Sequence, residues 1–93
     1  MSAFVVVQGT VTDPDKMQEY AAAAGPTVAA HGGEIMVRGP IQVLSGSSDH
    51  KISVVIQFPD AAKARSWYES AEYQALIPIR KLALNSTFTL VGE

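Results

Sequence analysis

The chain has 93 residues, no cysteine and a net charge of -2, and this length predicts one domain that spans residues 1–93. Charged residues make up 17% of the chain, below the about 25% that is usual in globular domains, and apolar residues make up 47%. The absence of cysteine excludes disulfides and thiolate chemistry, and the scattered placement of the seven basic residues argues against a nucleic-acid partner.

The first predicted element is a strand over residues 3–11, an apolar, β-branched stretch that is too short for a helix. Because this stretch has no basic start and cannot span a bilayer, we expect a soluble, cytoplasmic protein without a membrane partner. A helix is predicted next, with Asp13 as N-cap and Pro14 at its first position. Its buried stripe comprises Met17, Tyr20, Ala21, Ala24 and Val28. We expect the glycine-proline pair at 25–26 to interrupt or kink this helix, and the glycines at 32–33 to end it.

The rest of the chain is predicted to hold two more strands, helical segments and a final strand. Residues 34–46 have the pattern of an edge strand with a bulge, broken at Gly39 and Pro40, because proline cannot donate to a ladder. Residues 51–58 are apolar enough for a central strand. The remaining elements are a helix over 61–70 capped by Asp60, a helical stretch over 71–84 that Pro78 kinks or splits, and a strand over 87–91.

This order of elements predicts an α+β fold, a ferredoxin-like βαββαβ sandwich with an antiparallel four-stranded sheet. Alternation along the strands predicts one uniformly apolar face that packs under the helices. That face comprises Val5, Val7, Ile35, Val37, Ile52, Val54, Ile56, Phe58, Phe88 and Leu90. The opposite face is half apolar and comprises Phe4, Val6, Gln8, Thr10, Glu34, Met36, Arg38, Ser53, Val55, Gln57, Thr87, Thr89 and Val91.

The half-apolar face is predicted to be an interface. In a monomer it exposes five apolar side chains together, those of Phe4, Val6, Met36, Val55 and Val91. Each gains about 1.5–3 kcal/mol on full burial, so a partner is expected to cover them. An identical subunit is the commonest choice, which predicts a homodimer. The polar side chains of this face then line an internal space.

Several segments together resemble the DUF1330 family of small uncharacterised bacterial proteins. They are VTDPDKMQEY, AAHGGEIMVRG, VVIQFPD, WYESAEYQALIPIR and STFTLV, which are spread over nearly the whole chain. The resemblance implies a ferredoxin-like protomer in a dimeric α+β barrel, within a superfamily that includes small monooxygenases, haem-degrading enzymes and lactone isomerases. It implies no particular reaction, because the family has no settled one.

The candidate catalytic residues are His31 and Tyr20. His31 follows the first predicted helix and has the pKa range of a general base or proton relay, although a histidine there also suits the last helical carbonyls. Tyr20 is the second candidate for moving a proton. His50 lies in a polar turn and is expected to be solvated, and two separate histidines predict no metal site.

The candidate ligand-binding residues are Arg38, Trp67, Tyr73, Arg80 and Gln8. The arginines suit a carboxylate or carbonyl group, and the aromatic residues supply apolar pocket walls with polar ends. Packing alone also explains the aromatic residues. An ion pair with Glu34, or with a carboxylate of the other subunit of the dimer, also explains Arg38. No phosphate loop, nucleophile elbow or dinucleotide motif occurs, and we expect no cofactor.

These residues predict a homodimer that binds or transforms a small acidic or carbonyl-containing molecule in a pocket between sheet and helices. The alternative is a dimeric scaffold or accessory module without chemistry, in which the same residues only hold an interface. A cofactor-independent monooxygenase or haem-degrading enzyme is a narrower alternative, although the sequence has no motif that fixes an iron ligand.

Overall fold

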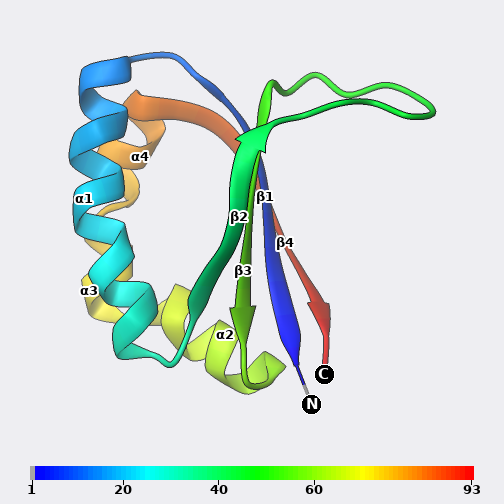
Figure 1. The fold of residues 1–93 in the computed structure, drawn as a ribbon. Helices are drawn as coiled ribbons and strands as arrows, with labels where there is room; N and C mark the ends of the chain where they lie inside the picture. The colour runs from blue at the N-terminus through cyan, green and yellow to red at the C-terminus, as the bar shows by residue number, and fades with distance from the viewer. Residues whose placement is uncertain (1) are drawn as a thin grey trace.

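A computed structural model describes residues 2–93, which form one four-stranded antiparallel sheet with helices on one side (Figure 1). The elements in chain order are β1 (Ala3–Val11), α1 (Pro14–Ala30), β2 (Glu34–Pro40), β3 (Ile52–Phe58), α2 (Ala61–Glu69), α3 (Ala71–Gln74), α4 (Ile77–Ala83) and β4 (Leu84–Gly92). The strands lie in the order β2-β3-β1-β4. The predicted ferredoxin-like βαββαβ fold is therefore confirmed, with its second helical unit divided into α2, α3 and α4.

The local sequence explains where α1 begins and ends. Asp13 Oδ1 accepts hydrogen bonds from the backbone N–H groups of Asp15 and Lys16, both at 3.1 Å, which confirms the predicted N-cap. Gly32 follows the helix with a φ of 77°, a conformation that favours glycine. The predicted interruption at residues 25–26 does not occur. Proline removes only one backbone donor, and buried residues on both sides of it hold α1 against the core.

The second helical unit is split near Pro78, as predicted. Pro78 lies in the first turn of α4, where its missing N–H costs no helical hydrogen bond. Asp60 caps α2 by accepting a hydrogen bond from the backbone N–H of Lys63 at 2.8 Å. Within residues 2–93, no helix combines the length and the apolar character that a bilayer span requires.

Two strand boundaries differ from the prediction. β2 ends at Pro40 and does not continue to residue 46, because proline has no N–H to extend the ladder. Residues 41–51 instead form a loop that projects away from the helices (Figure 1). β4 begins at Leu84, directly after α4, because its pairing with β1 extends to Val11.

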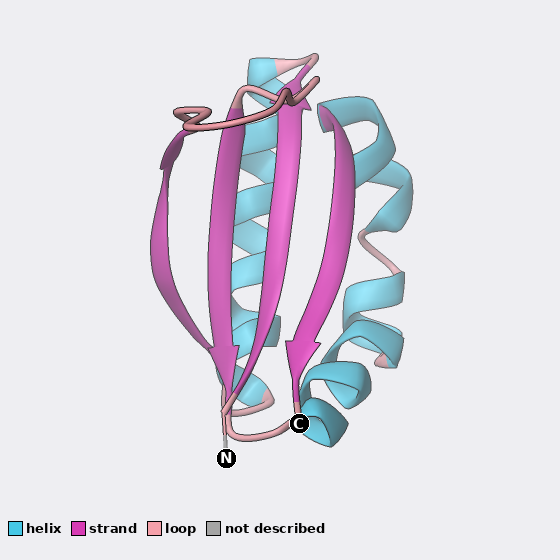
Figure 2. Cartoon of the chain, turned by 90° about the vertical axis from the view of Figure 1, so that its right-hand side faces the viewer, coloured by secondary structure: helices cyan, strands magenta, loops and turns pink. Residues whose placement is uncertain are grey.

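The core lies between the helices and one face of the sheet. Its buried residues are Val5, Val7, Tyr20, Val28, Ile56, Phe58, Ala64, Trp67, Tyr73, Ala83 and Leu84. The other face carries no helix, as the view onto the sheet shows (Figure 2). The prediction of two unlike faces, one covered and one open, is confirmed.

The predicted faces are wrong in the edge strand β2. The pairing with β3 skips Met36, so that Val37 lies opposite Val55 and Arg38 lies opposite Val54. The extra residue of this β-bulge reverses the alternation beyond it. Val37, expected in the core, is therefore 60% exposed on the open face. Arg38, expected on the open face, belongs instead to the side that faces the helices.

Candidate functional site

A cavity of about 270 Å³ lies between α1 and the helix-facing side of the sheet. All four strands contribute to its lining, and Trp67 of α2 adds an aromatic wall. Its sheet walls include the apolar residues Val7, Ile35, Ile52, Val54, Ile56, Leu84 and Phe88. Small-molecule pockets usually measure about 300–1,000 Å³, so this cavity suits a small ligand.

The cavity exists because the buried stripe of α1 carries small side chains at its middle. Ala21, Ala24 and Gly25 line the cavity at positions where a leucine or isoleucine would fill it. A Cβ atom added to Gly25 would meet no atom within 4 Å, which shows open space beside the helix. The larger Tyr20 and Val28 are buried on either side of this gap.

Arg38 is the charged residue of the cavity lining. The bulge in β2 places it on the helix-facing side, at the edge strand, where its side chain is exposed to solvent. Glu34 lies before the bulge and pairs with Gln57 of the open face, which separates it from Arg38. Among residues 2–93, no carboxylate lies within ion-pair distance of Arg38, so the expected ion pair with Glu34 does not form.

Three tyrosines and an arginine form a hydrogen-bonded cluster that reaches the cavity through Tyr20. The hydroxyl oxygens of Tyr20 and Tyr73 lie 2.6 Å apart. Arg80 Nη1 donates to the Tyr73 hydroxyl at 2.9 Å and to the Tyr68 hydroxyl at 3.1 Å. The guanidinium carbon also lies 4.7 Å from the centre of the Phe88 ring, a cation–π distance.

Burial sets the protonation of this cluster. It raises the pKa of Tyr20 and of Tyr73, so both hydroxyls stay protonated at neutral pH. Burial alone would lower the pKa of Arg80, but its hydrogen bonds to Tyr73 and Tyr68 outweigh this effect and raise it. Within the described part of the chain, no carboxylate pairs with Arg80. The cluster therefore holds the positive charge of Arg80 beside the neutral phenols of Tyr20 and Tyr73.

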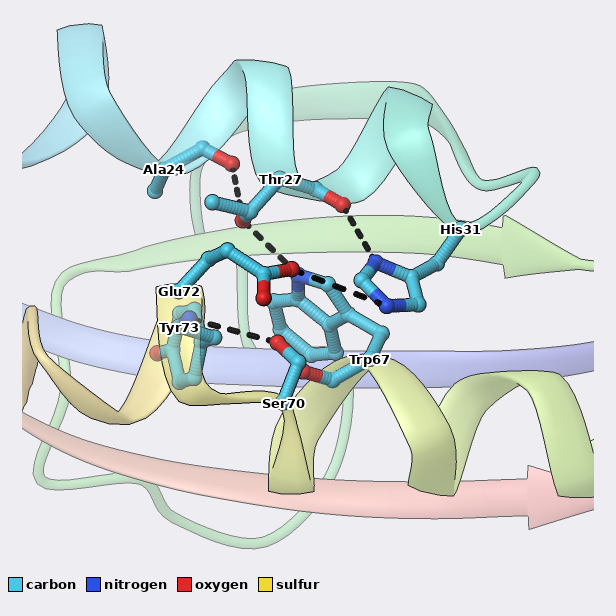
Figure 3. Close-up of polar contacts among 7 residues, drawn as sticks. All are labelled: Ala24, Thr27, His31, Trp67, Ser70, Glu72 and Tyr73. Atoms are coloured by element: carbon cyan, nitrogen blue, oxygen red, sulfur yellow. Dashed lines mark hydrogen bonds and ion pairs between the residues drawn. The ribbon is translucent and has the colours of Figure 1, made fainter.

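Trp67 and His31 both bond to Thr27 of α1 (Figure 3). Trp67 Nε1 donates to Thr27 Oγ1 at 3.0 Å, and this hydroxyl donates to the Ala24 carbonyl at 2.6 Å. His31 Nδ1 lies 2.9 Å from the Thr27 carbonyl oxygen, and its Nε2 lies 3.9 Å from the Glu72 carboxylate. His31 thus caps the end of α1 and links it to α3, while Trp67 is fixed as a cavity wall.

The structure brings Arg38, Tyr20 and Trp67 together around one cavity. Tyr73 and Arg80 lie behind Tyr20, in the hydrogen-bonded cluster. These five predicted site residues therefore belong to one connected region between the helices and the sheet.

The other two predicted site residues lie elsewhere. His31 is at the end of α1 and outside the cavity lining, and Gln8 is exposed on the sheet. Sequence reasoning did not single out Thr27, although a hydroxyl residue beside Val28 in a helix interior is a usable signal. Among residues 2–93, no three histidine, aspartate or glutamate side chains gather closely enough to hold a metal ion.

The fold and the cavity together define a ferredoxin-like α+β protein with a ligand-sized space beneath its first helix. The chain belongs to the family described as "Domain of unknown function (DUF1330)", which it matches over residues 2–93. No curated protein matches the chain.

Solved structures share this fold at low sequence identity. The RPA0582 protein of unknown function from Rhodopseudomonas palustris is 16% identical with a TM-score of 0.77, over 99% of this chain and 82% of that chain. A dimeric ferredoxin-like protein of unknown function from Jannaschia sp. CCS1 is 12% identical with a TM-score of 0.76, over 100% of both chains. SnoaB, a cofactor-independent oxygenase from Streptomyces nogalater, is 13% identical with a TM-score of 0.72, over 99% of this chain and 92% of that chain. These likenesses establish the shared fold.

Proposed function

We propose that the protein is a homodimer that binds a small, mostly apolar molecule with an acidic or carbonyl group in the cavity beneath α1. The observation that carries this proposal is the position of Arg38. A bulge turns this side chain toward an apolar cavity, and no carboxylate of residues 2–93 neutralises it. Bulges of this kind often re-aim a side chain next to a binding site.

The chemistry of the lining supports an acid with an apolar body. A guanidinium group binds a carboxylate through two parallel hydrogen bonds, which fixes orientation as well as charge. The valine, isoleucine and aromatic walls favour an apolar body over a sugar or a phosphate ester. The residues assign no bond-breaking step, and we therefore propose binding.

The open face of the sheet supports the homodimer. Val37 and Val91 are 60% and 56% exposed on a face that no helix covers. A second copy of the same face is the simplest cover, since most soluble oligomers are homo-oligomers with twofold symmetry. Two of the structures with this fold are described as dimeric ferredoxin-like proteins, from Jannaschia sp. CCS1 and Thermobifida fusca.

A thermal-shift screen of aliphatic and aromatic carboxylic acids, each paired with its uncharged amide, tests the binding proposal. We expect aromatic acids to raise the melting temperature of the wild type more than their amides, because Arg38 recognises the charge. Arg38→Met should lower the affinity for the acids by about tenfold, the scale of one hydrogen-bonded charge at a partly solvated site. Arg65→Met is the matched control, because Arg65 is exposed on α2 and lies outside the cavity lining.

Two results would contradict the proposal. If no acid stabilises the wild type at millimolar concentration, the result favours the alternative of a dimeric scaffold without a ligand. If acids stabilise the wild type and Arg38→Met equally, the site lies elsewhere in the molecule.

A further inference from the structure

Tyr20, which lines the cavity, belongs to a hydrogen-bonded cluster in which one hydroxyl proton has no acceptor among residues 2–93. Arg80 can only donate, so its bond to Tyr73 occupies an acceptor position of that phenol oxygen. Tyr20 and Tyr73 carry two hydroxyl protons but share one contact of 2.6 Å. One of the two protons therefore lacks an acceptor among residues 2–93.

The direction of the hydrogen bonds from Arg80 through Tyr73 leaves the proton without an acceptor on Tyr20. A positive guanidinium beside the Tyr73 oxygen makes that hydroxyl a stronger donor and a weaker acceptor, and hydrogen bonds in a chain polarise one another in this way. Tyr73 thus donates to Tyr20, whose own proton is left free. Tyr20 lines the cavity, whereas Tyr73 lies outside the lining.

We infer that Tyr20 donates a hydrogen bond to an oxygen atom of the bound molecule, and that Arg80 polarises this donor through Tyr73. This inference rests on the proposed function, since it concerns the same cavity. Tyr20 is then a direct ligand contact, and Tyr73 and Arg80 are positioning residues. The raised pKa of both phenols is consistent with this role, because it keeps them as donors at neutral pH.

The two polar groups lie toward opposite edges of the sheet, which specifies the shape of the ligand. Arg38 is on the edge strand β2, and the Tyr73 ring lies 6.4 Å from Phe88 of β4, the other edge strand. The three inter-strand gaps between these edges span roughly 14 Å. The ligand class that fits is an elongated, planar aromatic acid with a phenol or ketone oxygen at the end opposite its carboxylate.

Three biphenyl compounds separate the two contacts. The first, 4′-hydroxybiphenyl-4-carboxylate, carries both oxygen-bearing ends, while biphenyl-4-carboxylate lacks the phenol and 4-phenylphenol lacks the acid. Calorimetric dissociation constants are measured for the wild type, Tyr20→Phe, Tyr73→Phe and Arg38→Met, after circular dichroism has shown that each variant is folded. The informative quantity is the affinity ratio of the hydroxylated acid to the plain acid, because a general weakening of the fold affects both compounds alike.

We expect the wild type to bind the hydroxylated acid about three- to tenfold more tightly than the plain acid, the scale of one net hydrogen bond. Tyr20→Phe should bring this ratio close to one. Tyr73→Phe should lower it in part, because it cuts the connection to Arg80, and this variant decides the matter if Tyr20→Phe does not fold. Arg38→Met should weaken both acids together, leave the ratio unchanged and spare 4-phenylphenol.

The outcomes distinguish this inference from the function on which it rests. If both acids bind with an Arg38-dependent affinity but the ratio is the same in the wild type and the tyrosine variants, Tyr20 is not a ligand contact and only the inference is overturned. If none of the three compounds binds the wild type at millimolar concentration, the proposed function fails and the inference falls with it.

Discussion

Thr27 shows how one hydroxyl connects a helix to a cavity wall. Its Oγ1 accepts the indole N–H of Trp67 at 3.0 Å and donates to the Ala24 carbonyl at 2.6 Å. Trp67 is among the largest fully buried side chains, so its N–H has no access to water. The hydroxyl therefore satisfies a buried donor as well as tying α2 to α1.

Thr27→Val keeps the shape of the side chain but removes this hydroxyl. We expect it to lower the free energy of unfolding by about 1–3 kcal/mol, because the Trp67 N–H is then buried without an acceptor. Urea unfolding followed by tryptophan fluorescence measures the change. Thr27→Ser is the matched control and should cost less, since the hydroxyl remains. Equal losses in the two variants would show that packing, and not the hydrogen bond, is what matters at this position.

At the residue scale, strand alternation predicted the wrong face of the sheet for Arg38. Counting by twos from Glu34 places Arg38 on the open face, and no residue in EIMVRGP indicates the extra position at Met36. The glycine and proline at 39–40 suggested a bulge there, but the register shift occurs earlier. The arginine was recognised as a candidate by its residue type, while its direction required the pairing with β3.

At the scale of elements, α1 determines whether a cavity exists at all. Met17, Tyr20, Ala21, Ala24 and Val28 were predicted to form its buried stripe, and all five line the cavity that faces the sheet. The volume of the cavity between this stripe and the sheet depends on how closely the helix approaches all four strands. No local sequence pattern encodes that distance. The caps at Asp13 and Asp60 were predictable because they depend only on adjacent residues.

Ala24 and Ala23 offer a matched pair on this helix. Ala24 lines the cavity, and Ala23 is exposed to solvent. Ala24→Leu adds apolar volume to an existing space and should fill it without overpacking, so the folded state should not lose stability. Ala23→Leu adds the same atoms to the outer surface and should leave the cavity open.

At the scale of the whole molecule, the fold has two faces with different roles. The covered face holds the core and the cavity, and the open face holds exposed apolar side chains that a partner would bury. The order of elements and the alternation in β1, β3 and β4 were sufficient to predict this division. Only β2 departed from it, because a single extra residue changes the face of everything that follows.

The homodimer is tested by sedimentation equilibrium at micromolar concentration. We expect a mass twice the 9.9 kDa of one chain. Val6→Lys places a charge on the open face and should shift the mass toward that of a single chain while the circular dichroism spectrum is unchanged. Gln18→Lys, an exposed position on α1, is the control and should remain dimeric. A wild type that sediments as a stable single chain would contradict the dimer.

The proposed ligand site is the space between α1 and the sheet. The most direct test is the dissociation constant of biphenyl-4-carboxylate for the wild type, Ala24→Leu and Ala23→Leu, measured together with the melting temperature of each protein alone. We expect at least tenfold weaker binding by Ala24→Leu at equal or higher melting temperature, and unchanged binding by Ala23→Leu. Undiminished binding by a folded Ala24→Leu variant would contradict the proposed site.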